Sequence, residues 1–391
     1  MADSTAAARP SEDPILASPL VDQAEGGAHL DPPAGSAAPM PEINRKRLHR
    51  RLLVFVGVGV LVVVAVLTGP GLGTLRRDVE NASVGWLVLG IGLEALSALS
   101  YVVLFRAVFC PRMPWRLSYQ FGMSEQGANS VVSVSGAGGL ALGAWALKRA
   151  GMGADDIGRK SVALFFLTSL PNVVGVIVFA ALYATGVLGH DRDPALTYGF
   201  GAAALGATLL VLALPHLLSK KPDPPAAEHP GRIGRALRFA RHSLAQGVHD
   251  AILLVRGHSP GILLGSLGIV AFDMAVLGAC FIAFGHAPPL GVLVLGYLIG
   301  QLGGNLPTPG GIGGVDLGLV GVFTLYHQPL AATTAAVLVY HAISLWVPGV
   351  LGSVAFVRLR GTLRREAQPA IVCAPFTEPI ATVSLDHAPA S

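Results

Sequence analysis

The sequence predicts an all-α polytopic membrane protein, and three observations carry that prediction. Hydrophobic residues make up 52% of the 391-residue chain, charged residues only 13%, and the mean hydropathy is +0.60. Soluble domains of this length do not combine these values. Apolar runs long enough to cross a hydrocarbon core of roughly 30 Å recur along the chain. Two further apolar stretches are broken by Gly, Ser and Pro, so we expect six full spans plus two Gly/Pro-broken, re-entrant helical hairpins, arranged as an inverted repeat.

The expected elements follow one another in a regular order. Residues 1–43 are rich in Ala, Pro, Ser and acids without apolar periodicity, which predicts a disordered cytoplasmic tail. A basic cluster precedes the first apolar run, but no signal-peptide cleavage pattern follows it, so we expect this run to remain as a span. The six expected spans are 52–69, 84–108, 161–188, 195–217, 259–286 and 330–357.

The same pattern divides the membrane part into two halves. The first half is expected at 44–218 with a hairpin at 117–150, and the second at 259–360 with a hairpin at 289–325. A short cytoplasmic tail at 361–391 follows the second half.

Lysine and arginine are concentrated in alternate loops, and this orients the chain. Basic residues in short loops stay on the cytoplasmic side, so we expect both termini to be cytoplasmic and the protein to lie in the cell membrane. The assignment requires each broken stretch to return to the side from which it enters, either as a re-entrant hairpin or as two full crossings. The stretch at 117–150 then enters from the cytoplasm and that at 289–325 from outside, so the two halves are inverted.

The connector at 219–258 contains an amphipathic pattern. Apolar residues recur at three- and four-residue spacing over 231–256, and arginines occupy the other face. This pattern predicts an interfacial helix on the anionic cytoplasmic leaflet; the alternative is a solvated link between the halves.

The two broken stretches share a Gly-rich motif. The segment 135–143 reads Ser-Gly-Ala-Gly-Gly-Leu-Ala-Leu-Gly, and 310–318 reads Gly-Gly-Ile-Gly-Gly-Val-Asp-Leu-Gly. Pro307 and Pro309 interrupt a helix in the second copy, leaving backbone N–H groups without helical partners. Such a helix start is suited to a phosphate or carboxylate head group. The alternative is that these glycines only allow close helix packing.

Polar residues in and near the broken stretches are the candidate site. For substrate binding we select Asn305, Thr308, Gly310, Gly311, Gly313, Asp316, Asn129, Gly136, Gly138 and Gln301. Ionisable groups within apolar segments are costly, so Glu94, Glu125, Asp273 and His341 are candidates for coupling or a polar relay. The competing interpretations are capping of broken backbone for the amides and a satisfied core histidine for His341.

No enzyme motif occurs in the sequence, so we expect no enzymatic activity and no cofactor. The three cysteines, Cys110, Cys280 and Cys373, are too scattered for a zinc or redox site, and no metal is expected. The excess of basic over acidic residues does not indicate a nucleic-acid partner, because basic residues in the cytoplasmic loops of a membrane protein account for it. No pattern in the sequence indicates an oligomeric state.

The run from Asn305 to Asp316, followed by an apolar helix, resembles the flippase-like transmembrane region of the lysylphosphatidylglycerol synthase family. The segment 129–151 resembles that family's first-half motif, with Ala141 at the position of Asp316. The resemblance implies movement of a lipid or lipid-linked head group between leaflets. It does not imply aminoacyl transfer, because the family's synthases carry a large soluble domain after the membrane part, whereas a short tail is expected here.

Two alternatives to a lipid translocase remain open from the sequence. One is a proton-coupled small-solute carrier that uses Glu94 and Asp273. The other is a membrane scaffold or partner of a separate glycosyl- or aminoacyltransferase.

Overall fold

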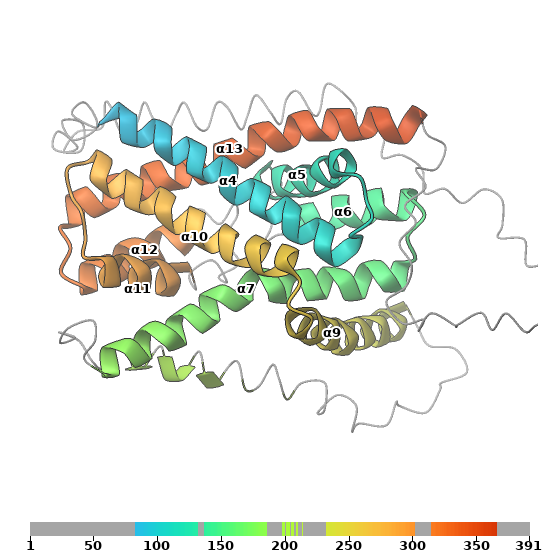
Figure 1. Cartoon of the computed structure of the whole chain (residues 1–391), viewed down its shortest axis with the longest axis horizontal. Coiled ribbons are helices and arrows are strands. Elements are labelled where there is room, and N and C mark those ends of the chain that lie inside the picture. Colours follow the sequence, from blue (N-terminus) through green and yellow to red (C-terminus); the bar gives the residue numbers. More distant parts are fainter. Residues whose placement is uncertain are drawn as a thin grey trace, which may run out of the picture. The chain divides into compact units, whose positions relative to one another are not determined.

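The computed structural model describes residues 83–131, 137–185, a few helical residues between 198 and 213, 232–301 and 314–365 (Figure 1). These parts of the chain are helical and contain no strand, which confirms the all-α class. The described helices all belong to one folding unit, Ile43–Ser391. The tail 1–43, the span 52–69, most of the span 195–217 and residues 366–391 lie outside the described residues.

Four long helices are apolar enough to cross a membrane. They are α4 (Val84–Phe109), α7 (Ala154–Ala184), α10 (Pro260–Ala283) and α13 (Leu330–Arg365). Each coincides with an expected span and differs from it mainly at the ends, where α7 begins earlier and α13 runs on to Arg365. Large apolar side chains such as Leu264 are exposed on their surfaces, as expected for helices surrounded by lipid.

Four shorter helices occupy the two broken stretches. They are α5 (Trp115–Val131), α6 (Ala137–Arg149), α11 (Leu290–Gly300) and α12 (Gly314–Leu325). At about 1.5 Å per residue, none of them reaches the roughly 30 Å of a hydrocarbon core. The intervening residues 132–136 and 302–313 lie outside the described part.

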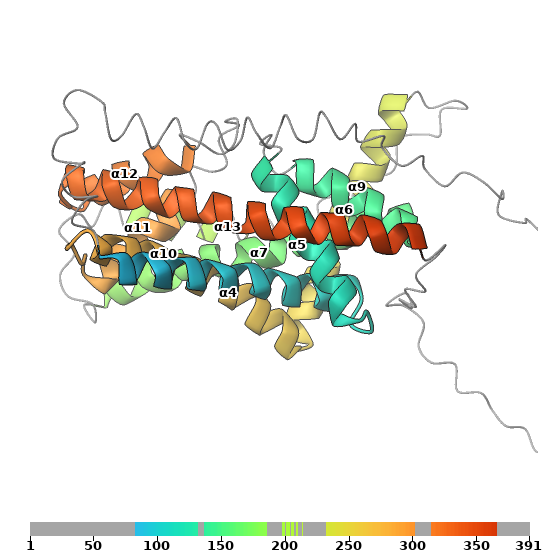
Figure 2. The same cartoon turned by 90° about the horizontal axis from the view of Figure 1, so that it is seen from above.

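Helices α4 and α10 run antiparallel and side by side (Figures 1 and 2). The Ser83 N–H donates to Ala283 O at 2.9 Å, and Ser97 Oγ donates to Ile269 O at 3.1 Å, so numbers rise along α4 as they fall along α10. Farther along, a Cβ placed on Gly265 would lie 2.7 Å from the backbone N of Leu104. Glycine therefore lets the two backbones approach.

Helix α13 packs on α5, and helix α7 packs on α11. A Cβ on Gly127 of α5 would lie 2.7 Å from Cα of Gly352 on α13. On α7, a Cβ on Gly175 would lie 2.9 Å from a methyl carbon of Leu298 on α11. An internal proline precedes each of these helix glycines by one turn, Pro171 in α7 and Pro348 in α13, and proline removes one helical hydrogen bond at that point.

The amphipathic stretch at 231–256 forms helix α9 (Arg232–Arg256), which packs on α7. A Cβ on Gly247 would lie 2.6 Å from Arg159 O, so the two helices cross closely. Arg159 contacts Asp156 at 2.8 Å and Asp250 of α9 at 3.7 Å. Burial raises the pKa of the Asp250 carboxyl, and the charge of Arg159 opposes that rise. Val248 and Ala251 of α9 are also buried, so part of the apolar face of α9 packs on protein.

Candidate functional site

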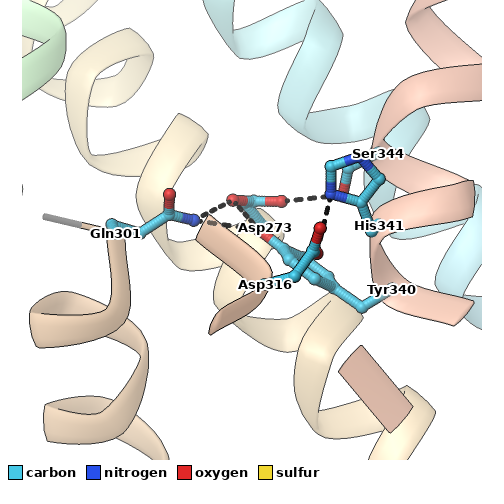
Figure 3. Close-up of polar contacts among 6 residues, drawn as sticks. All are labelled: Asp273, Gln301, Asp316, Tyr340, His341 and Ser344. Carbon is cyan, nitrogen blue, oxygen red and sulfur yellow. Dashed lines mark hydrogen bonds and ion pairs between the residues drawn. The ribbon is translucent and has the colours of Figure 1, made fainter. Parts of the chain in front are cut away.

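Asp273, near the middle of α10, lies at the centre of a partly buried polar cluster (Figure 3). Its Oδ2 accepts hydrogen bonds from Tyr297 Oη at 2.6 Å, Tyr340 Oη at 2.8 Å and Gln301 Nε2 at 3.4 Å. Its Oδ1 accepts from Ser344 Oγ at 3.4 Å. Gln301 Nε2 also donates to Tyr340 Oη at 2.9 Å, which ties the donors to one another. All four donors are neutral, so they can stabilise a carboxylate without cancelling its charge.

Helix geometry explains how two elements supply these donors in pairs. Tyr297 and Gln301 are four residues apart at the end of α11, and Tyr340 and Ser344 are four residues apart on α13. Residues with this spacing lie on the same helix face, one turn apart. Each helix therefore presents two donors to Asp273.

A second carboxyl group, that of Glu94 on α4, faces Asp273. The antiparallel register brings the two positions opposite each other, because Gly90 lies next to Val276 and Ser97 bonds to Ile269. The side chains of Glu94 and Asp273 interact directly. Glu94 is only 6% exposed, and its Oε2 has no hydrogen-bond partner among the described residues.

A histidine and a third acid lie beside this pair. His341 follows Tyr340 on α13, and its Nδ1 is 2.9 Å from Oδ1 of Asp316 in the first turn of α12 (Figure 3). Both side chains are somewhat more accessible than Glu94, at 20% for His341 and 16% for Asp316. The contact links the start of α12 to the face of α13 that carries the donors to Asp273.

The polar residues of the first broken stretch are used differently. Glu125 of α5 is buried, interacts with Tyr101 of α4 and packs on α6, where a Cβ on Gly143 would lie 3.0 Å from Glu125 Oε2. Asn129 Oδ1 accepts the backbone N–H of Gly139 at 2.7 Å. Asn129 therefore caps the start of α6, as the capping interpretation of the amides expected.

The structure brings together several residues that the sequence analysis had selected one by one. Glu94, Asp273, Gln301, Asp316 and His341 belong to the cluster of α4, α10, α11, α12 and α13. Glu125 and Asn129 lie apart from it around α5 and α6, where Gly138 is in the first turn of α6. The remaining candidates lie outside the described residues: Asn305, Thr308, Gly310, Gly311, Gly313 and Gly136.

Three members of the cluster were missed by the sequence analysis, namely Tyr297, Tyr340 and Ser344. A usable signal existed, because Tyr297 precedes Gln301 by one turn and the other two flank His341 within an apolar span. As for metals, the described residues include no group of three or more His, Cys, Asp or Glu placed to hold an ion.

Long apolar helices and a polar cluster buried among them define a multi-pass helical membrane protein. The chain belongs to the family described as the lysylphosphatidylglycerol synthase TM region, whose sequence model matches residues 52–352. This confirms the resemblance seen at 305–316. A UPF0104 membrane protein of Methanothermobacter thermautotrophicus is 26% identical over 334 residues, which cover 79% of this chain and 93% of the relative.

Proposed function

We propose that this protein moves a lipid, or a lipid-linked head group, between the leaflets of the cell membrane and catalyses no covalent reaction. One observation carries the proposal: a hydrogen-bonded acid cluster around Asp273 lies among helices long and apolar enough to span a membrane. Burying such groups in lipid is costly, and intramembrane polar clusters commonly mark a substrate path. Membership of a family named for a lipid-synthesising enzyme's membrane region supports a lipid as the substrate.

An inverted repeat would supply the two alternating states of a transporter. The helix packing supports such a repeat. Ser266 of α10 donates to Leu167 O of α7, while Gly90 of α4 lies against Ile343 of α13. Gly90 and Ser266 are separated by the same number of residues as Leu167 and Ile343. Exchanging α4 with α10 and α7 with α13 therefore turns one contact into the other, as a pseudo-two-fold axis in the membrane plane requires.

A second correspondence links the long helices to the short ones. The segments 171–175 in α7 and 348–352 in α13 both read Pro-x-Val-x-Gly. The glycine of each meets a short helix of the other half, α11 for α7 and α5 for α13. Because all four short helices are too short to cross the core alone, we assign them to two re-entrant hairpins. With the basic residues on the inner side, both chain termini are cytoplasmic.

The chemistry of the cluster suggests that different chemical groups of one head group bind at two subsites. Glu94, Asp273 and Asp316 offer carboxyl oxygens, and the contacts given above include no Lys or Arg. These oxygens suit the hydroxyl or amine groups of a head group. We assign its phosphate to the backbone of 305–316, the segment that leads into α12.

Reconstitution into lipid vesicles tests this function. Fluorescent phosphatidylglycerol, phosphatidylethanolamine and a lipid-linked sugar are placed in the inner leaflet, and a membrane-impermeant quencher added outside reports their arrival. The wild-type protein should accelerate the quenching of at least one lipid relative to empty vesicles. The variants Asp316→Ala and Pro309→Ala should slow it.

Thr334→Val is the matched control, because Thr334 Oγ1 lies on α13 but only donates to Leu330 O. Its transport should equal that of the wild type. Lipid movement that is undiminished in both Asp316→Ala and Pro309→Ala would remove the proposed subsite.

The contact between Glu94 and Asp273 favours a second candidate function, a proton-coupled carrier of a small solute. Such a carrier would accumulate solute in vesicles made of any bilayer-forming lipid and would move no labelled lipid. The same vesicles, loaded with candidate solutes, separate the two functions.

A further inference from the structure

The hydrogen-bond donors around Glu94 of α4 and Asp273 of α10 are distributed unequally between the two acids. Tyr297, Tyr340, Gln301 and Ser344 all donate to Asp273. None of these hydrogen bonds reaches Glu94, whose Oε2 is buried without a partner among the described residues. Among the described residues, these four donors therefore stabilise negative charge on Asp273, and none of the four does so for Glu94.

Two carboxyl groups in direct contact within a helix bundle, one of them only 6% exposed, cannot both be ionised without strong repulsion. A single shared proton removes that repulsion. With four neutral donors already on Asp273, the proton belongs on Glu94, whose hydroxyl then donates to Asp273.

We propose that Glu94 and Asp273 form a proton-binding site whose proton is released and rebound in each transport cycle, so that the pH gradient drives lipid movement. The inference rests on the translocase function proposed above and names its energy source. Departure of the proton leaves two adjacent carboxylates, which repel each other across the α4–α10 interface. An amine or hydroxyl of the head group can then take the place of the proton.

The other titratable groups around the pair fit this role. Tyr297 on α11 and Tyr340 on α13 donate to Asp273, and Cys280 lies farther along α10. Asp316 of α12 and His341 of α13 form the adjacent, more accessible pair, which can receive the proton.

The remaining helices packed on α4 and α10 add no competing group. Glu125 of α5 interacts with Tyr101, and Asp250 of α9 interacts with Arg159. Residues 161–182 of α7 include no titratable side chain. Within the part of the chain that the structure describes, the proton site is thus confined to the cluster.

The first test observes the proton directly in the purified full-length protein. Infrared difference spectra between acidic and alkaline pH report the C=O stretch of a protonated carboxylic acid. Glu94→Gln keeps a donor towards Asp273 but cannot ionise, so one acid band should disappear. Ser97→Ala, one turn away on the same helix face, removes only a bond to Ile269 O and should keep every band. Identical acid bands in Glu94→Gln and wild type would overturn the proton site.

The second test measures coupling in phosphatidylcholine vesicles that contain a minor fraction of fluorescent phosphatidylglycerol or phosphatidylethanolamine. In wild type, reversing an imposed pH gradient should change the net direction of lipid movement. Glu94→Gln should lose this response, and Ser97→Ala should keep it. Lipid movement in wild type that ignores the gradient would overturn the coupling while leaving the translocase function intact. If wild type moves no lipid, the proposed function fails, and the infrared bands still decide whether the proton site exists.

Discussion

The two broken stretches of this protein share a Gly-rich motif but use their polar residues in opposite ways. In the first, Asn129 caps α6 and Glu125 is enclosed by Tyr101 and Gly143. In the second, Gln301 reaches out to Asp273 on α10, and Asp316 reaches His341 on α13. The contacts given above for Asn129 and Glu125 stay within α5 and α6 apart from that with Tyr101 of α4, whereas the second stretch joins a polar cluster to which α4, α10 and α13 all contribute.

Two sequence differences account for this contrast. Aligning Asn129 with Asn305 sets Glu125 against Gln301, so the first hairpin carries an acid where the second carries an amide. An amide donates to an acid on a neighbouring helix, whereas a buried acid needs a donor of its own. At the later motif position the first hairpin has Ala141 in place of the second hairpin's acid, which removes any link to a histidine. Two stretches with a shared Gly-rich motif can thus differ in whether their polar side chains contact a carboxyl group on a long helix.

The largest expected effect comes from Asp273→Ala, which is compared with Glu125→Ala in the first broken stretch. Asp273→Ala leaves the hydroxyls of Tyr297 and Tyr340 without their acceptor and removes the centre of the cluster. We expect lipid movement to fall about a hundredfold, equivalent to roughly 2.7 kcal/mol in the barrier. Glu125→Ala should change lipid movement far less and mainly lower the midpoint of thermal unfolding. Equal losses of transport in the two variants would break the comparison, because both hairpins would then be functional.

A medium effect is expected where the long helices α13 and α7 cross the short helices α5 and α11. The Cβ added by Gly127→Ala or Gly352→Ala would meet backbone atoms, whereas in Gly175→Ala it would meet the flexible end of Leu298. The first two variants should lose about 1–3 kcal/mol of stability and the third less than about 1 kcal/mol. Thermal unfolding in detergent measures the difference. Similar losses in all three variants would show that the two crossings are equally tight.

The smallest expected effect concerns the cap on α6. Asn129→Ala removes the acceptor for the Gly139 N–H and should cost about 1 kcal/mol. Asn129→Asp keeps an acceptor and should recover most of that loss. Thermal unfolding follows the stability, and the vesicle assay should show little change in either variant. A large transport defect in Asn129→Asp would give this residue a role beyond capping.

Much of the fold could be predicted because length and hydropathy alone identify a spanning helix. The four long helices begin or end within a few residues of the expected spans, and the basic amphipathic pattern at 231–256 forms α9. The polar residues Glu94, Asp273 and His341 were recognisable because charge is costly in an apolar run. Their partners were harder to identify. Tyr297 and Tyr340 are apolar along most of their length, so hydropathy counts them as core.

The pairing of Glu94 with Asp273 could not be predicted from periodicity. It depends on the register of α4 against α10, which close contacts such as that between Gly265 and Leu104 determine. Each helix is almost uniformly hydrophobic, so neither sequence reveals which face meets the other. Glu125 presented the same difficulty, since its partner Tyr101 lies on a separate helix.

The crossings of α13 on α5 and of α7 on α11 have a consequence for how the chain can be divided. Each of these two long helices packs on a short helix encoded on the other side of the connector, so the segments before and after the connector are interlocked like partners in a domain swap. A break in the connector would separate the chain into two pieces without separating the structure. Each piece alone would lack the short helix on which its long helix packs. We therefore expect the two pieces to be stable only when they are co-expressed and assemble.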